Sequence, residues 1–163
     1  MVFMKPPFRS PGGDAVTGLV LDLFRLNNQL LAAGDRMVAP LGLTSARWQI
    51  LGAVVAAATP QPVAWLARDL GSHRQNVQRI VNDLANEGIV AFEANPHHRK
   101  AQLVVLTKKG RRIFDEAMRL QAPWSDRLAH GVSVADIQTA HDVMTALARN
   151  VSAMANAESD SET

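Results

Sequence analysis

Residues 63–90 read VAWLARDLGSHRQNVQRIVNDLANEGIV and open the most informative part of the chain, residues 63–110. Its first eight residues predict a short helix with one apolar face, made of Val63, Leu66, Ala67 and Leu70. Gly71 supplies a tight turn, and a second helix is expected over residues 72–87, with Ser72 as its N-terminal cap. Two helices joined by a short glycine turn indicate a helix-turn-helix.

The second helix has an apolar stripe and an opposite polar side. The stripe consists of Val77, Ile80, Val81 and Leu84. The polar side presents Gln75, Asn76, Arg79 and Asn82. Amide side chains can bond adenine at two atoms, and arginine can do the same to guanine, so this side suits the DNA major groove. A polar helix that merely faces solvent is the alternative, but it would more often carry Glu and Lys, and no acid precedes Asp83 here. Ser72 and Arg74, in the first turn, are assigned to phosphates.

Two strands and a basic turn follow this helix. The strands are expected at residues 89–93 and 102–106, and the turn between them reads Asn95-Pro96-His97-His98-Arg99-Lys100. Such a hairpin after a helix-turn-helix is typical of a wing. Arg99 and Lys100 are predicted to contact the minor groove or its phosphates. His97 and His98 are expected to add hydrogen bonds and, in mildly acidic solution, positive charge.

The rest of the chain is predicted to be mostly helical. Residues 1–13 contain three prolines and two adjacent glycines and predict a flexible arm. A helix follows and ends near residue 40, Thr44 is expected to cap another that ends near residue 57, and Thr107 is expected to cap one that runs from residue 108 towards residue 127. The last helix opens at Ser133 and repeats apolar residues every seven positions, in the rows Ile137, Met144, Val151 and Ala140, Leu147, Met154. Such rows pack against other helices. Residues 157–163 predict a disordered acidic tail.

Composition narrows the class of protein. The chain has 163 residues, of which 47% are hydrophobic, typical of a globular protein. No apolar run approaches the roughly 18–20 residues that span a bilayer, and residues 1–13 lack the apolar core of a signal peptide, so no membrane partner and a cytoplasmic location are expected. The chain has no cysteine, which excludes disulfides and thiolate ligands.

Charge is distributed unevenly. The net charge is +2, yet residues 72–112 hold eight Lys or Arg and three Asp or Glu, a net +5. The remainder holds nine bases and twelve acids, a net −3. A basic segment on a mildly acidic body indicates a polyanion such as double-stranded DNA, although an ordinary solvated surface is the alternative.

Motifs for enzymatic chemistry are absent from the sequence. It contains no nucleophile elbow, no phosphate loop and no metal-ligand cluster, and the adjacent His97 and His98 have no cysteine or acid nearby at zinc-ligand spacing. We therefore predict no enzyme, no cofactor and no metal. A winged helix used only for protein–protein contact remains the alternative to DNA binding.

Several short motifs together resemble the MarR family of bacterial transcription regulators. They are Leu66-Ala67, the Gly71 turn, residues 72–77, Leu84, residues 87–90, residues 106–110 and the leading residues 43–51. The resemblance covers about residues 15–156 and implies a mainly α fold with a small β wing. It implies a homodimer, in which residues 14–40 and 111–156 form a helical dimerisation region and residues 41–110 form a winged helix-turn-helix. It further implies a palindromic operator, usually bound by a repressor that a small aromatic or phenolic effector releases.

The resemblance also marks one departure and one candidate effector site. Family members usually carry Asp where this chain has Asn95 and His98, and those acids would brace the arginine matched by Arg99. The wing of this chain should therefore be more positive. Effectors of similar proteins bind between the dimer region and the DNA-binding lobe, where Arg47 and Trp48 are candidates to pair a carboxylate and to stack. Trp48 as a plain core residue is the favoured alternative. Trp65 points away from the core face of its helix and either covers a neighbouring element or lines a cleft.

Overall fold

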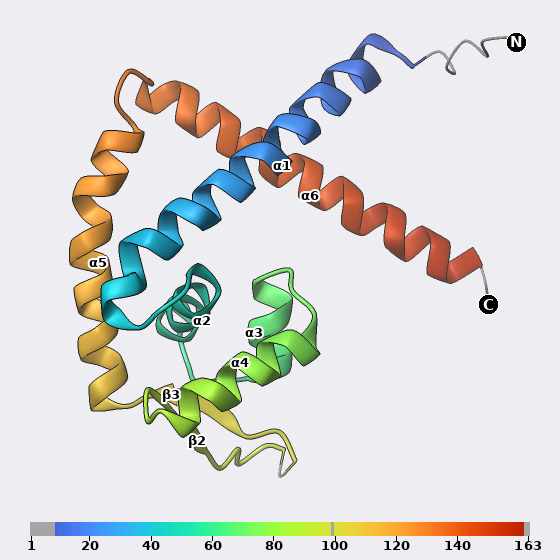
Figure 1. The fold of residues 1–163 in the computed structure, drawn as a ribbon. Helices are drawn as coiled ribbons and strands as arrows, with labels where there is room; N and C mark the ends of the chain where they lie inside the picture. Colours follow the sequence, from blue (N-terminus) through green and yellow to red (C-terminus); the bar gives the residue numbers. More distant parts are fainter. Residues whose placement is uncertain (1–8, 99, 162–163) are drawn as a thin grey trace, which may run out of the picture. The chain divides into compact units, whose positions relative to one another are not determined.

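The computed structural model describes residues 9–98 and 100–161. They form a mainly α-helical fold with one small antiparallel sheet, as the sequence predicted (Figure 1). The chain divides into two compact units, one that ends at Gln121 and one that begins at Ala122. Within the described ranges, no helix combines the length and the apolar character that crossing a bilayer requires.

The first helix, α1, spans Pro11–Val38 and begins inside the segment predicted as a flexible arm. Ser10 explains this early start, because its Oγ accepts a hydrogen bond from the Gly13 N–H at 3.1 Å. Pro11 fits the first turn, where its missing N–H would have had no partner inside the helix. The helix ends at a short 3₁₀ turn, η1, which spans Ala39–Leu41.

The helix α2 spans Ser45–Ala56, and Thr44 caps it as predicted by accepting the Arg47 N–H at 3.3 Å. Ser45 ties this helix to α1. Its N–H donates to Asp35 Oδ1 at 2.6 Å and its hydroxyl donates to the Leu31 carbonyl at 2.7 Å. Because Ser45 is buried, these bonds satisfy polar groups that would otherwise be costly to bury.

The helix-turn-helix consists of α3, Val63–Asp69, and α4, Arg74–Asn86. Gly71 makes the turn with a φ of 58°, a left-handed conformation that glycine adopts without strain. This turn directs the Ser72 N–H back to the Ala67 carbonyl at 2.9 Å. The helix α4 therefore starts two residues later than predicted. The predicted Ser72 cap is wrong, since His73 occupies that position without a side-chain hydrogen bond.

The sheet has three strands, in the order β1-β3-β2. The predicted hairpin is confirmed as β2, Val90–Glu93, and β3, Leu103–Leu106, which pair antiparallel with Val90 opposite Leu106. The sequence missed β1, Gln61–Pro62, because two residues that include a proline read as a break. An edge strand tolerates proline, since one side of it needs no N–H donor.

The helix α5 spans Lys108–Leu128, and Thr107 caps it as predicted by accepting the Gly110 N–H at 3.0 Å. Phe114 and Ala117 are buried in the same core as the helix-turn-helix and the sheet. The first part of α5 therefore belongs to the compact unit of the winged helix. The boundary predicted between residues 110 and 111 falls inside that unit.

The second unit contains α6, which spans Val134–Ser161. Ser133 opens it as predicted: its Oγ accepts the Asp136 N–H at 3.1 Å and donates to Asp136 Oδ2 at 2.7 Å. The helix continues through residues 157–161, which the sequence had placed in a disordered tail. No glycine or proline lies between Val134 and Ser161, so nothing in this stretch interrupts the helix.

Candidate DNA-binding surface

The helix α4 buries its apolar stripe and exposes its polar side, as predicted. Val77, Ile80, Val81 and Leu84 are buried. The side chains of Gln75, Asn76, Arg79 and Asn82 are exposed. The orientation expected for a recognition helix is therefore confirmed, whereas contact of these side chains with bases stays a prediction.

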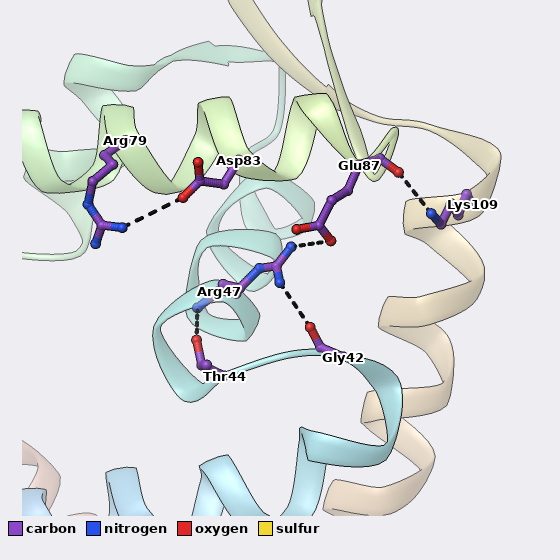
Figure 2. Close-up of polar contacts among 7 residues, drawn as sticks. All are labelled: Gly42, Thr44, Arg47, Arg79, Asp83, Glu87 and Lys109. Carbon is purple, nitrogen blue, oxygen red and sulfur yellow. Dashed lines mark hydrogen bonds and ion pairs between the residues drawn. The ribbon is translucent and has the colours of Figure 1, made fainter.

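Short-range contacts hold the exposed side chains of α4 in place. Arg79 Nη2 donates to Asn76 Oδ1 at 3.1 Å, and Arg79 Nη1 lies 3.6 Å from Asp83 Oδ2. Figure 2 shows this ion pair along α4. Both of its side chains are more than half exposed, so the pair is weak. Gln78 donates to Asn82 Oδ1 at 3.0 Å in the same way.

The C-terminal end of α4 is anchored to both α2 and α5 (Figure 2). Arg47 Nη2 lies 2.6 Å from Glu87 Oε2, and Arg47 Nη1 donates to the Gly42 carbonyl at 2.9 Å. Lys109 Nζ donates to the Glu87 carbonyl at 2.8 Å. The Arg47 side chain is only 19% exposed, so solvent screens this ion pair less than the one at Arg79. These contacts fix the direction in which α4 projects.

The two residues predicted to bind an effector occupy different surroundings. Arg47 lines an open cleft of about 480 Å³ together with Arg79 and Asp83. Trp48 does not line this cleft and packs half-buried against the core. An effector carboxylate would have to compete with Glu87 for the Arg47 guanidinium. The effector role of both residues stays a prediction.

A groove of about 470 Å³ lies between α4 and the wing. The helix contributes Arg74, Gln78 and Asn82, and the wing contributes His98, Lys100, Ala101 and Gln102. The sequence pattern assigned no role to Gln78 or Gln102, because a groove between segments far apart in the chain leaves no local pattern. Ser72 and His97 are exposed but do not line it. Arg99, the main predicted wing contact, lies outside the described residues.

Asn95 closes the wing turn with both ends of its amide. Its Oδ1 accepts the His97 N–H at 2.9 Å, and its Nδ2 donates to the Ala101 carbonyl at 2.9 Å. An aspartate in this position could accept the first bond but has no proton to donate to the second when ionised. The asparagine at this position therefore forms a brace across the turn that a carboxylate could not supply.

We expect Asn95→Asp to loosen the wing, because the bond to the Ala101 carbonyl is lost. A net hydrogen bond contributes about 1 kcal/mol, so amide hydrogen exchange in the turn should become roughly fivefold faster, above all at the Ala101 N–H that donates to His98. Asn150→Asp makes the same chemical change at an exposed site on α6 and is the control. Equal exchange in the wing of both variants would contradict the brace.

Comparison with known proteins identifies the family. The MarR family model matches residues 41–101. An uncharacterised protein of Mycobacterium tuberculosis is 40% identical over 129 residues, which cover 79% of this chain and 89% of that protein. The transcriptional activatory protein BadR of Rhodopseudomonas palustris is 33% identical over 99 residues, 60% of this chain and 57% of BadR.

Solved structures share the fold. The transcriptional repressor CouR bound to a 23-mer DNA duplex superposes with a TM-score of 0.70 at 23% identity, over 86% of this chain and 99% of CouR. CouR from Rhodococcus jostii bound to p-coumaroyl-CoA superposes with a TM-score of 0.72 at 22% identity, over 80% of this chain and 91% of CouR. The chain belongs to the MarR family of winged helix-turn-helix transcription regulators.

Proposed function

We propose that this chain acts as a homodimer that reads a palindromic operator. In this proposal α4 enters the major groove and the wing reaches the adjacent minor groove. The exposed row of amide and guanidinium side chains on α4 carries the proposal, because each can bond a base edge at two atoms. The complex of CouR with a DNA duplex supports it, since CouR has the same fold.

Each exposed residue receives a role in this proposal. Arg79 reads guanine, and the amides of Gln75, Asn76 and Asn82 read adenine. Ser72 and Arg74 contact phosphates at the start of α4, and His97, His98 and Lys100 do so from the wing. Arg99, outside the described residues, is proposed to enter the minor groove or to contact its phosphates.

Salt dependence tests the proposal against the alternative of a protein-binding winged helix. A protein that neutralises about 6–10 phosphates loses roughly 10³–10⁵ in affinity between 50 and 200 mM salt. Fluorescence anisotropy measures the affinity of this chain for duplex DNA. We expect that affinity to fall by a factor of roughly 10³–10⁵ as salt rises from 50 to 200 mM. Failure to bind DNA, or binding that ignores salt, would favour the protein-binding alternative.

Repression is the proposed direction of regulation. CouR, which shares the fold, is named a repressor, and BadR, which shares sequence, is named an activator. A reporter gene placed behind a DNA sequence that the protein binds distinguishes repression from activation. We expect expression to fall when the protein is present. A rise would assign this chain to activation and leave its DNA-binding mode unchanged.

Uncovered apolar side chains on α1 and α6 support the proposed dimer. On α1 they include Leu19, Leu23, Phe24 and Leu26, which are 40–62% exposed. On α6 one of the predicted seven-residue rows is exposed, with Ile137 and Met144 at 44% and Val151 at 66%. Helices of this kind lower their free energy by burying these side chains against another copy.

We expect Val151→Asp to weaken the dimer at least tenfold. Burial of a valine side chain contributes about 1.5–3 kcal/mol, and a buried carboxylate without a partner adds a further cost. Because Val151 is 66% exposed in the single chain, its folding should be little affected. Sedimentation velocity at several concentrations measures the shift towards monomer. Ala153→Asp, which lies two positions further along α6 at an exposed site outside both seven-residue rows, should leave the dimer unchanged.

A small aromatic or phenolic molecule is proposed as the effector. CouR has been solved with p-coumaroyl-CoA, an aromatic acyl thioester, which supports this class of ligand. The proposed contacts are Arg47 for a carboxylate and Trp48 for the ring. Adding a panel of aromatic acids to the DNA complex tests this class of effector, because an effector should release the DNA. If the same acid also releases DNA from Arg47→Gln and from Trp48→Leu, these two residues do not belong to the effector site.

A further inference from the structure

Trp65 is an exposed tryptophan on the outer face of α3. It is 52% exposed, whereas Val63, Leu66 and Ala67 of the same helix are buried. The guanidinium carbon of Arg68 lies 4.4 Å from the centroid of the Trp65 ring, a cation–π contact. The half-exposed indole therefore carries an exposed arginine against its ring, so both side chains are available to a ligand.

Trp65 lines the groove between α4 and the wing. It shares this groove with Arg74 and Gln78 of α4 and with His98 and Lys100 of the wing. Two cations, Arg74 and Lys100, and the imidazole of His98 thus line the same groove as the indole. The sequence left the role of Trp65 undecided between covering a neighbour and lining a cleft, and the structure places it at a cleft.

The geometry of duplex DNA determines what would pass through this groove. A major groove and the adjacent minor groove are separated by one sugar–phosphate strand. If α4 enters the major groove and the wing reaches the adjacent minor groove, that strand must run between them. This step rests on the proposed function.

We propose that Trp65 and Arg68 form a phosphate clamp on this strand. The indole Nε1–H donates to a phosphate oxygen in the groove, and Arg68, which stacks on the ring but does not itself line the groove, neutralises the charge of a neighbouring phosphate. An indole N–H is a donor only, so it suits phosphate oxygens, and neither contact reads a base. The clamp supplies affinity and sets the register of α4 on the duplex without adding sequence preference.

Three variants test the clamp in the full-length protein. Arg68→Ala should lower the slope of log affinity against log salt by about 0.9, the effect of one phosphate contact. Trp65→Phe keeps a ring for Arg68 but removes the N–H, and should weaken DNA binding about tenfold, which corresponds to ~1.4 kcal/mol. Trp65→Ala should lose more, because Arg68 also loses its support. Arg25→Ala removes an exposed cation from α1 and is the charge control, with an unchanged slope expected.

Fluorescence quenching reports on Trp65 directly. The signal of the wild-type protein minus that of Trp65→Phe isolates this indole, with Trp48 and Trp124 left in place. Acrylamide should quench the isolated signal in the free protein, since the side chain is exposed, and should quench it much less in the DNA complex. A clamp with no part in folding also predicts unchanged thermal denaturation of the variants.

The outcomes separate the clamp from the proposed function. If the wild-type protein binds DNA, but Trp65 stays equally quenchable in the complex and the Arg68→Ala slope matches that of Arg25→Ala, the clamp is wrong and the proposed function stands. If the wild-type protein binds no DNA, the proposed function fails and the clamp fails with it. A uniform loss of affinity on all DNA sequences, together with protection of Trp65, supports both.

Discussion

Replacing Gly110 with alanine is expected to destabilise the protein by about 3 kcal/mol, a large part of the stability of a typical domain. A Cβ at this position would lie 2.0 Å from the Ile89 carbonyl oxygen and 3.0 Å from its carbon. Ile89 cannot move easily, because its carbonyl accepts the Thr107 N–H at 3.1 Å. The start of α5 would therefore be pushed away from the turn that follows α4.

Gly18→Ala is the matched control for this substitution. Gly18 also lies inside a helix, but a Cβ there would meet no atom within 4 Å. Alanine favours the helical backbone over glycine by about 0.8–1 kcal/mol, so this variant should be as stable as the wild type or slightly more stable. Urea denaturation at one protein concentration measures both. Equal midpoints for Gly110→Ala and Gly18→Ala would show that the close approach of α5 to Ile89 is not tight.

Arg79→Ala is expected to cost roughly 1–3 kcal/mol of operator binding and to relax preference at one base pair in each half-site. Arg79 is exposed on α4 and is held by Asn76 and Asp83, so its guanidinium is already extended along the surface that would face the major groove. Arg74→Ala removes a proposed phosphate contact from the same helix. It should weaken binding evenly across sequences and reduce the salt slope.

The carboxylate of Asp83 contributes a second effect to the loss of affinity in Arg79→Ala. Removal of Arg79 leaves Asp83 without its ion-pair partner, and its charge then repels DNA. The double variant Arg79→Ala/Asp83→Ala removes the base contact and also the repulsion between Asp83 and DNA. We therefore expect it to bind more tightly than Arg79→Ala while its base preference stays relaxed. Affinities for the operator and for single-base variants of it provide the measurement. An unchanged base preference in both variants would show that Arg79 does not read a base.

Local pattern was enough to predict the helices and the two hairpin strands of the winged helix, and the face that α4 buries, whereas the two-residue strand β1 was missed. The 3.6-residue spacing of Val77, Ile80, Val81 and Leu84 fixed which side chains of α4 are exposed, because the apolar stripe had to enter the core. The caps at Thr44, Thr107 and Ser133 were also predicted, since each depends on residues within one turn. Ser72 does not cap α4 because it still belongs to the end of α3, where its N–H donates to the Ala67 carbonyl.

Contacts between distant parts of the chain could not be predicted in the same way. Arg47 and Glu87 are forty residues apart, and nothing in either local sequence indicates their ion pair. From the sequence, Arg47 was a candidate to pair with the carboxylate of an effector. In the structure its guanidinium already forms an ion pair with Glu87. The brace from Asn95 to Ala101 was missed for a related reason, since the resemblance suggested only that two carboxylates were absent. The groove that contains Trp65 likewise forms only when α3, α4 and the wing come together.

Selection of duplexes from a random DNA pool by the wild-type protein tests most directly whether the exposed face of α4 reads bases. A dimer that places one α4 in each of two successive major-groove sites should enrich two inverted half-sites whose centres lie about 10 base pairs apart. A pool that retains duplexes without enriching any sequence, or that enriches one half-site with no inverted partner, would contradict base reading by a dimer.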